Sequence, residues 1–553
     1  MRKRYQLKRS SKWVIAAVAV ISFGLYSFQD TYFEISKNLD IFVSVYKNVN
    51  TYYVDETEPG DLMKTGIDAM LKKLDPYTVY YPESDIEDFR FMTTGQYGGI
   101  GALISRKDDY VIISEPYENS PAHKAGLKAG DIILEIDGKS AKGKSTQEIS
   151  SFLKGEPNTE MVLSIKRFNE DAPISITVTR EEIKIKDVPY YGLIDEKTGY
   201  IKLNSFTETA SSEVKKSLVE LKEKHQITNL ILDLRGNGGG LLREAVNIVG
   251  LFVPTGTKVV ETKGKLTDWN QTYVTSQPPV DTEIKLVVLV NGGSASASEI
   301  VSGTIQDLDR GVIIGTNTFG KGLVQQTRDL KYNSKMKLTV AKYYIPSGRC
   351  IQKLDYSHKD KEGHATQIPD SLRKEFSTKS GRKVLDGAGI EPDFKVEGII
   401  PSPILISLAQ KQLIFDYATV YQSQHNSIAP ANEFVIDNEE YNKFKEFLKD
   451  KDYSYSTETE KLLEKLEKAA EKEQYVTDIE KDFKNLEDAI FKNKAKDLDI
   501  FKDQITRFLE SEIVTRYYFQ SGKIQQSLVK DEDVLEAQKV LSDANTYKAT
   551  LSK

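Results

Sequence analysis

The sequence predicts a multidomain α+β protein, in which an α/β core with a mixed sheet carries an inserted small β domain and helical segments at both ends. Three observations predict this fold class. The 553 residues exceed what one hydrophobic core normally holds, which indicates three or four structural units. Short apolar runs alternate with amphipathic stretches over residues 186–400, whereas Lys, Glu and Asp dominate residues 401–553.

The first thirty residues differ from the rest and predict export. Residues 13–28 carry no charge, and a basic run precedes them, a pattern typical of a signal peptide or signal anchor. Ser22-Phe23-Gly24 is a poor cleavage site, so we expect an uncleaved anchor, with a cleaved signal as the alternative. The expected location is the bacterial cell envelope, anchored in the inner membrane and facing the periplasm, or periplasmic after cleavage. The basic residues are Arg2, Lys3, Arg4, Lys8, Arg9 and Lys12.

The next two segments have contrasting patterns. Residues 31–94 show apolar residues at helical spacing, which predicts a small helical segment that packs on another domain or on a second copy of the chain. Asp75-Pro76 ends that pattern. Residues 95–185 begin with clustered glycines and continue as short β-like runs, which predicts a compact mixed β domain. The expected strands are Tyr110–Ser114, Ile132–Ile136, Met161–Lys166 and Ile174–Val178, with helices at Pro121–Ala125 and Ser145–Leu153.

Residues 186–400 predict the α/β core. Asn229–Leu234 and Lys285–Val290 are continuous apolar runs of the kind found in buried parallel strands. Ser211–His225 has one apolar helical face. After residue 400 apolar residues recur at three- and four-residue steps among many charges, which predicts an all-helical region with a structural role. Further strands are expected at Gly199–Leu203, Val312–Gly315 and Met336–Ile345.

Composition limits the function. The net charge of −6 argues against nucleic acid as a partner. Cys350 is the only cysteine, so the chain has no internal disulfide and no cysteine metal cluster. The five histidines lack the spacing of a metal-binding pair, and we expect neither a metal nor a cofactor. These histidines are His123, His225, His358, His364 and His425.

A serine-rich turn is the first motif that indicates chemistry. Gly293-Ser-Ala-Ser-Ala-Ser-Glu299 lies between the expected strand Lys285–Val290 and the helical run Glu299–Leu308. The first N–H groups of a helix have no acceptor within the helix. A serine at this position can therefore act as a nucleophile while the N–H groups form half of an oxyanion hole. Taken alone, the turn is better explained as a helix N-cap with a serine-rich turn.

Two glycine-rich loops follow other strands. Gly315-Thr-Asn-Thr-Phe-Gly-Lys-Gly322 nearly fits a phosphate-binding loop, but Gly322 replaces the hydroxyl residue and the next residues look extended rather than helical. Asp233-Leu-Arg-Gly-Asn-Gly-Gly-Gly240 lacks the third glycine of a dinucleotide fingerprint, because Leu241 occupies its place. Neither loop therefore fits a nucleotide site. The remaining interpretation of the loop at residues 233–240 is that its backbone N–H groups closely approach an anionic oxygen.

Together with the run Ser120-Pro-Ala and Ala125-Gly-Leu of the β domain, these motifs resemble the C-terminal processing (tail-specific) peptidases, over residues 35–400. That family has a serine protease core and a PDZ domain, which the resemblance places at 186–400 and 95–185. It implies Ser296 as nucleophile, Lys321 as general base and Gln325 as the residue that orients the lysine. The N–H groups of Gly240 and Ala297 would form the oxyanion hole. The PDZ loop Gly98, Gly99, Ile100 and Gly101 would hold a peptide C-terminus.

The implied chemistry is consistent with general principles. A serine hydroxyl needs a base, and a lysine acts as one only when neutral, a form that burial among apolar groups favours. A histidine triad is less suitable, because His123 lies in the PDZ motif and His358 and His364 in a charged loop. The PDZ resemblance implies proteins or peptides with exposed C-termini as partners. The N-terminal segment predicts the membrane as a further partner, and a second copy of the chain is a candidate.

Two other functions remain open. A catalytically silent PDZ scaffold would bind protein tails without cleaving them, although Ser296, Lys321 and Gln325 are all present. An envelope scaffold would act through residues 401–553. The family resemblance does not extend to that region, and the charged stretch Leu354–Lys383 departs from the family pattern as an insertion.

Overall fold

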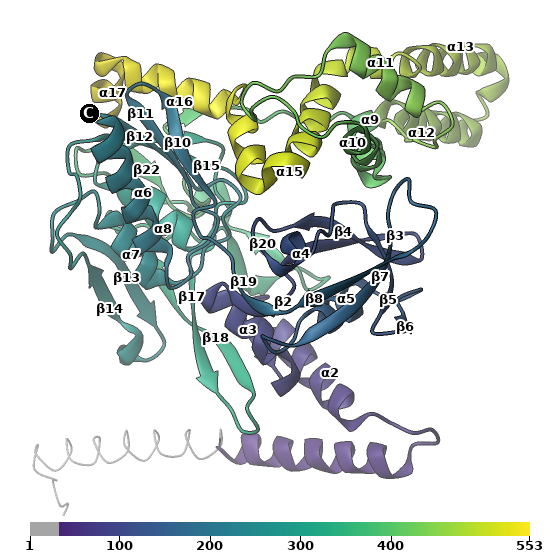
Figure 1. Cartoon of the computed structure of the whole chain (residues 1–553). Coiled ribbons are helices and arrows are strands. Elements are labelled where there is room, and N and C mark those ends of the chain that lie inside the picture. The colour runs from purple at the N-terminus through teal and green to yellow at the C-terminus, as the bar shows by residue number, and fades with distance from the viewer. Residues whose placement is uncertain (1–31, 553) are drawn as a thin grey trace, which may run out of the picture. The chain divides into compact units, whose positions relative to one another are not determined.

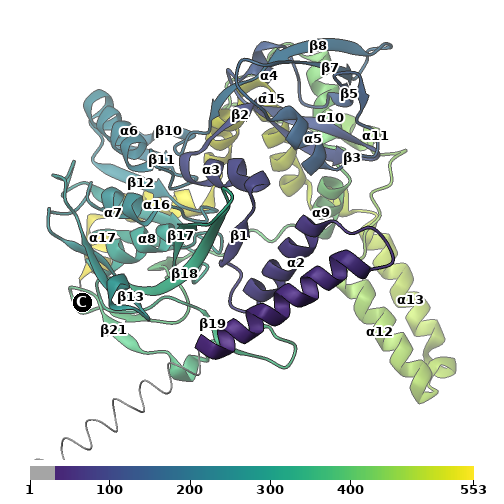
Figure 2. The same cartoon turned by 90° about the horizontal axis from the view of Figure 1, so that it is seen from below.

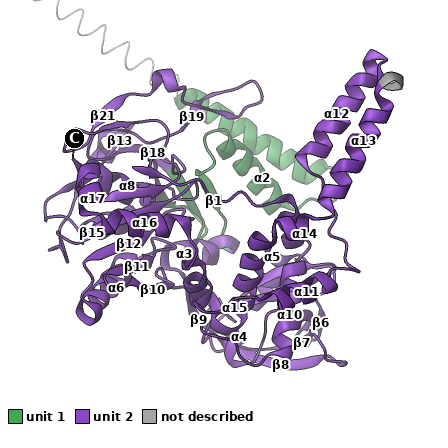
Figure 3. Cartoon of the chain, turned by 90° about the horizontal axis from the view of Figure 1, so that it is seen from above, with its two compact units in different colours: residues 1–83, 327–338 green, residues 84–326, 339–553 purple. Residues whose placement is uncertain are grey.

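The computed structural model describes residues 32–552, which divide into two compact units (Figure 3). The first comprises residues up to Glu83 with Thr327–Leu338, and the second comprises Ser84–Gln326 and the chain from Thr339 onward. The expected export segment, residues 1–30, lies outside the described residues. Among the described residues, no helix has both the length and the apolar character of a membrane span.

The first unit is mainly helical, as predicted. Residues 32–52 form one helix, and α2 (Pro59–Lys72) packs on it, with the Tyr46 hydroxyl donating to the Pro59 carbonyl at 2.8 Å. Asp75 accepts hydrogen bonds from two following N–H groups in the turn after α2, where the sequence predicts a break. The short strand β1 (Val79–Tyr81) then pairs antiparallel with the first residues of β18 (Lys335–Tyr344).

The β domain of the second unit has the predicted strands. Its sheet has the order β3-β4-β5-β7-β8, with β3 at one edge (Figure 1). Both helices begin at a serine: Ser120 Oγ accepts from the His123 N–H, and Ser145 forms a capping box with Glu148. The elements are β2 (Gln96–Gly99), β3 (Ala102–Lys107), β4 (Tyr110–Pro116), α4 (Pro121–Lys124), β5 (Ile132–Ile136), β6 (Lys139–Ser140), α5 (Thr146–Leu153), β7 (Glu160–Lys166), β8 (Ile174–Thr179) and β9 (Glu181–Lys184), which pairs with β2.

The core contains a six-stranded mixed sheet of order β10-β11-β12-β15-β16-β23. Only β10 is antiparallel, so the carboxyl ends of β12, β15 and β16 meet at one edge. The three loops that follow these strands are the three motif loops of the sequence, and the sheet brings them together. The strands are β10 (Tyr190–Asp195), β11 (Thr198–Lys202), β12 (Asn229–Asp233), β15 (Lys285–Val290), β16 (Val312–Gly315) and β23 (Phe394–Lys395).

Helices cover both faces of this sheet. On one face α6 (Ala210–His225), α7 (Leu242–Val249) and α8 (Ala297–Asp307) pack on the side chains of Leu230, Leu232 and their neighbours. On the other face, α16 (Glu532–Ser542) and α17 (Ala544–Leu551) pack on the alternate residues, such as Ile231 and Val287. The sequence assigned the core to residues 186–400, but these last two helices of the chain also complete its packing.

The remaining strands form smaller pieces. β13 pairs with β14 and with the last residues of β18, and β17 pairs with β18 as a hairpin. The charged stretch that the sequence marks as an insertion contains two small hairpins, β19 with β20 and β21 with β22. The bounds are β13 (Lys258–Gly264), β14 (Gln271–Val274), β17 (Leu323–Asp329), β19 (Leu354–Lys359), β20 (Ala365–Gln367), β21 (Glu375–Ser377) and β22 (Lys383–Leu385).

Residues after 402 are helical, as predicted. In Figure 2, α12 and α13 form a hairpin that runs side by side, and α10 packs along α15. The longest helix, α15, is kinked at Phe519, whose φ of 55° and ψ of −161° are not helical. The bounds are α9 (Pro403–Gln410), α10 (Leu413–Gln424), α11 (Asn438–Phe447), α12 (Glu458–Glu473), α13 (Val476–Lys494), α14 (Asp497–Ile500) and α15 (Lys502–Leu528).

Candidate active site

Ser296 lies at the sharp turn between β15 and α8, where the sequence predicts a strand, a turn and a helix. Its backbone has φ 56° and ψ −110°, a conformation that costs a non-glycine residue free energy and that clusters at functional sites. Serine nucleophiles of other hydrolases occupy a similarly strained turn between a strand and a helix, which exposes the hydroxyl at the edge of the sheet.

The neighbouring serines have other roles. Ser294 and Ser298 are fully buried, and their hydroxyls donate to the carbonyls of Leu234 and Asn237, each at 2.9 Å. Ser296 is partly exposed. Of the three serines in the motif, Ser296 is therefore the one that a substrate can reach.

The carboxylate of Glu299 connects the serine loop to the lysine loop. It is fully buried in the first turn of α8, and its Oε2 accepts from the N–H groups of both Ser296 and Lys321, each at 2.8 Å. Its Oε1 accepts from the Thr318 hydroxyl at 2.6 Å and from the Gly320 N–H at 2.7 Å. Burial raises the pKa of Glu299, and the hydrogen bonds donated to it offset part of that rise.

Lys321 lies in the loop between β16 and β17 and is partly exposed. Its main chain is held by Glu299, and the next N–H, that of Gly322, donates to Gln352 Oε1 at 2.7 Å. The residues after Gly322 form β17, as the sequence predicts, rather than the helix that a phosphate-binding loop needs. Gln325 lies on β17 and donates to Thr339 Oγ1 at 3.2 Å, so its role toward Lys321 stays a prediction.

The glycine loop after β12 lies directly against Ser296. A Cβ atom on Gly239 would approach Ser296 Cβ to 2.9 Å and the Ala297 nitrogen to 3.0 Å. Buried Asn237 joins the two loops, because its carbonyl accepts from the Ala295 N–H at 3.0 Å and from the Ser298 hydroxyl. Within residues 32–552, neither the Gly240 N–H nor the Ala297 N–H finds a protein acceptor, which leaves both groups available for an oxyanion.

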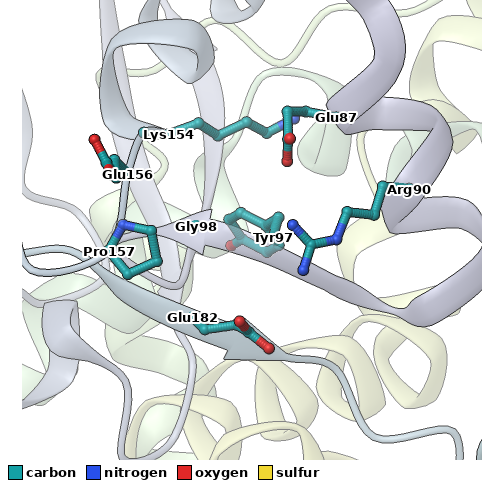
Figure 4. Close-up of a pocket in the computed structure, with 9 residues that line it drawn as sticks. Glu87, Arg90, Tyr97, Gly98, Lys154, Glu156, Pro157 and Glu182 are labelled. Atoms are coloured by element: carbon teal, nitrogen blue, oxygen red, sulfur yellow. The ribbon is translucent and has the colours of Figure 1, made fainter.

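The PDZ loop contains glycines for packing reasons. A Cβ on Gly98 would lie 2.2 Å from the Gly155 oxygen, and Gly101, with φ of 72°, lies against Ser120. Gly98 borders a cavity of about 370 Å³ (Figure 4). Three carboxylates and two cations line this cavity, a balance that does not favour a peptide carboxylate. The assignment of the loop from Gly98 to Gly101 to a peptide C-terminus therefore stays a prediction. The charged lining residues are Glu87, Arg90, Lys154, Glu156 and Glu182.

Sequence reasoning gave no role to Glu299 or to Asn237. Ser296 and Glu299 have the spacing of a capping box, in which the third helical residue accepts from the N-cap N–H, and this signal identifies Glu299. Its bonds to Thr318 and Lys321 join segments about twenty residues away, and no local pattern reveals them. The same holds for Asn237.

Comparison with known proteins decides the family. Residues 197–357 match the model of peptidase family S41, residues 112–167 match that of a PDZ domain, and residues 404–541 match that of a probable PDZ-protease C-terminal helical domain. A carboxy-terminal-processing protease of Bartonella bacilliformis is 36% identical over 59% of this chain and 74% of its own length. The chain belongs to peptidase family S41, the family of these processing proteases. This S41 member is thus a serine-type peptidase with a PDZ domain.

Other relatives match over different shares of their own length. A probable CtpA-like serine protease of Staphylococcus aureus is 37% identical over 57% of this S41 peptidase and 62% of its own chain. Among solved structures, a photosystem II D1 C-terminal processing protease is 26% identical over 64% of this chain and 92% of its own, with a TM-score of 0.34. The PDZ domain of a Vibrio cholerae carboxy-terminal protease, solved with a peptide, is 26% identical over 16% of this chain and 99% of its own, with a TM-score of 0.16.

Proposed function

We propose that this S41 peptidase cleaves proteins near unstructured C-termini in the bacterial cell envelope, using Ser296 and Lys321 as a catalytic dyad. The observation that carries the proposal is the shared Glu299 oxygen. Because one buried Oε2 binds the main chains of both Ser296 and Lys321, the two residues are held at a fixed separation. Reacting groups need such fixed geometry.

The mechanism follows from the geometry. Ser296 Oγ attacks the scissile carbonyl carbon while the neutral Lys321 amine takes its proton. The oxyanion that forms accepts hydrogen bonds from the Gly240 and Ala297 N–H groups. Lys321 returns the proton to the leaving amine, and water then hydrolyses the acyl-enzyme by the same route. Gln325 would orient the lysine.

The PDZ domain suggests the substrate class. Its strand β3 lies at the edge of the sheet, beside α5, where an extended peptide can add as a further strand. The substrate would then be a protein whose C-terminus is exposed and unstructured. The basic and apolar residues 1–30 support an envelope location, anchored or exported.

A peptidase assay on an unfolded reporter with a free apolar C-terminus tests the dyad. Ser296→Ala and Lys321→Ala should each lower kcat/KM by at least about a thousandfold. Ser302→Ala is the matched control, because Ser302 lies on the same helix and donates to the Ser298 carbonyl away from the site. Activity should also rise toward alkaline pH, as a lysine base loses its proton. Full activity of Lys321→Ala would refute the dyad.

The same assay distinguishes a Ser296–Lys321 peptidase from a catalytically silent PDZ scaffold. A scaffold would bind a C-terminal peptide with unchanged affinity in the wild type and in Ser296→Ala but would cleave the reporter in neither. A serine-directed fluorophosphonate should label the wild type and Ser302→Ala but not Ser296→Ala. Absence of both labelling and cleavage in the wild type would favour the scaffold.

A further inference from the structure

Arg235 links the glycine loop to the C-terminal helices. It follows β12 by two residues and directly precedes the loop that begins at Gly236. Its Nη1 donates to Asp531 at 2.9 Å and to Asp533 at 2.7 Å, and its Nη2 lies 2.8 Å from the second Asp531 oxygen. Asp531 is also the N-cap of α16, so the start of that helix and the guanidinium hold each other in place.

Charged groups hold Arg235 from the sheet side as well. Its Nε and Nη2 donate to the buried Asp233 carboxylate, and its carbonyl accepts from Lys202 Nζ at 2.6 Å. Tyr200 donates at 2.6 Å to Asp233 Oδ2, the oxygen that also accepts from Arg235 Nη2. The residue is thus fixed through both its side chain and its main chain.

The loop after Arg235 has few side chains with which to hold its own position. Four of its five residues are glycines, which lack side chains to pack. Its far end is held where the Leu241 N–H donates to the Phe206 carbonyl at 2.8 Å. Its near end is held by Arg235, by Asn291, whose side chain accepts from the Gly236 N–H, and by buried Asn237, whose side chain donates to the Leu203 carbonyl at 2.9 Å.

The aspartates are not needed to attach α16 to the sheet. Val534, Ala537, Val540 and Leu541 of α16 are buried against the sheet, and burial of apolar area is sufficient to keep the helix there. Partly buried ion pairs such as these add little net stability, and one known use of such pairs is to hold a single geometry. Their position next to the glycine loop therefore indicates a role in alignment.

We propose that Asp531 and Asp533, acting through Arg235, are positioning residues that align the Gly240 N–H with the oxyanion. The C-terminal helical region then contributes to turnover without contacting the reacting atoms. This inference rests on the proposed Ser296 and Lys321 mechanism.

The test uses the full chain and the double substitution Asp531→Asn and Asp533→Asn, which keeps shape but removes both charges. We expect kcat on a short fluorogenic peptide to fall by about 10- to 100-fold, with KM changed by less than about twofold. The control is Asp416→Asn, which breaks another ion pair of the helical region, with Lys107 of the PDZ domain. The control should keep the wild-type kcat.

A second readout reports on the oxyanion hole itself. A peptide aldehyde adds to the serine hydroxyl and places an oxyanion in the hole, so its affinity should weaken in parallel with kcat. A peptide that binds without adding to Ser296 should keep its affinity. Arg235→Lys keeps the charge but not the forked geometry, so its kcat should fall to a value between those of the wild type and the double variant. This variant replaces the double variant in the test if the double variant does not fold.

The outcomes separate the two proposals. If Ser296→Ala is inactive but the double variant and Arg235→Lys both keep full kcat and full aldehyde affinity, the positioning role is refuted and the dyad stands. If Ser296→Ala retains activity, the dyad itself fails. A fall in kcat with an equal loss of affinity for both peptide types would indicate general loss of structure and would also overturn the positioning role.

Discussion

At the scale of single residues, the site depends on carboxylates that do not react. Glu299 accepts four hydrogen bonds, from the Thr318 hydroxyl and from three main-chain N–H groups that belong to the serine and lysine loops. A buried carboxylate can satisfy so many donors because each oxygen accepts more than one hydrogen bond. The Asp233 carboxylate likewise accepts several hydrogen bonds, from Tyr200 and Lys202 of β11 and from Arg235 at the start of the glycine loop.

Glu299→Gln is predicted to disconnect the two loops. The amide keeps the shape of the side chain but turns an NH₂ group toward two of the four donors, so two hydrogen bonds are lost. We expect the free energy of unfolding to fall by about 2–4 kcal/mol and kcat to fall by about a hundredfold. Chemical denaturation and steady-state kinetics measure the two effects.

Asp393→Asn is the matched control for Glu299→Gln. Asp393 is also a nearly buried carboxylate, and it accepts from the Ile313 N–H, from Gln306 and from Arg382. It lies beside the start of β16, at the end of the sheet away from Ser296. Its loss should lower stability but leave kcat of the folded fraction unchanged. An equal fall in kcat for both variants would contradict the role given to Glu299.

Asp233 gives the unfolding free energy a predicted pH dependence. Burial alone would raise the pKa of Asp233, but Arg235, Lys202 and the Tyr200 hydroxyl hold it below the usual range. A carboxyl with a depressed folded-state pKa stabilises the fold above its unfolded pKa of about 3.9 and loses that contribution as the pH falls. The free energy of unfolding of the wild type should exceed that of Asp233→Asn by about 3–5 kcal/mol at neutral pH. It should shrink below about pH 4 in denaturation curves, and a difference independent of pH would contradict the ion pairs.

At the scale of elements, the strands were predictable but the contacts between their loops were not. Continuous apolar runs identify β12 and β15, since a parallel strand covered on both faces has no polar side. The sequence therefore predicts where the glycine and serine loops begin. It does not show that Asn237 joins these two loops or that Glu299 joins the serine loop to the lysine loop, because these hydrogen bonds connect residues distant along the chain.

The glycine loop allows a prediction with a matched pair of substitutions. Gly239 has φ of 99°, and an added Cβ would lie 2.7 Å from the Ala295 oxygen and 2.9 Å from Ser296 Cβ. Gly239→Ala should therefore push the loop away from Ser296 and lower kcat by about a hundredfold. A Cβ on Gly238 meets nothing within 4 Å, so Gly238→Ala should keep near wild-type kcat. Equal kinetics for the two variants would contradict the close approach of the loops.

At the scale of the second unit, the C-terminal helices contact both the PDZ domain and the core. Gln412 of the helical region donates to the Arg106 carbonyl of the PDZ domain at 2.9 Å, and Gly130 packs on Thr419. On the core side, Tyr547 exchanges hydrogen bonds with the main chain of Leu286. The periodicity of residues 401–553 predicts helices but not their partners, because charged amphipathic helices of similar pattern can pack on many surfaces.

These contacts predict that two deletions in the helical region differ in effect. Removing residues 532–553 takes away α16 and α17 and exposes Ile231, Val287 and Leu289 of the sheet. Each buried apolar side chain contributes about 1.5–3 kcal/mol, so exposure of these three alone removes about 4.5–9 kcal/mol, which is comparable with the whole stability of a typical domain. This truncated chain should be insoluble or unfolded.

Replacing the α12–α13 hairpin, residues 458–494, by a short flexible linker should be tolerated. Among the side chains described in this hairpin only Ala470 is fully buried, and Leu462, Leu466 and Phe491 are more than half exposed. The hairpin therefore contributes little to the packing of the core, and its removal leaves α16 and Arg235 in place. Thermal unfolding and cleavage of the reporter should both match the wild type. Loss of cleavage with an unchanged Tm would instead show that the hairpin engages the substrate.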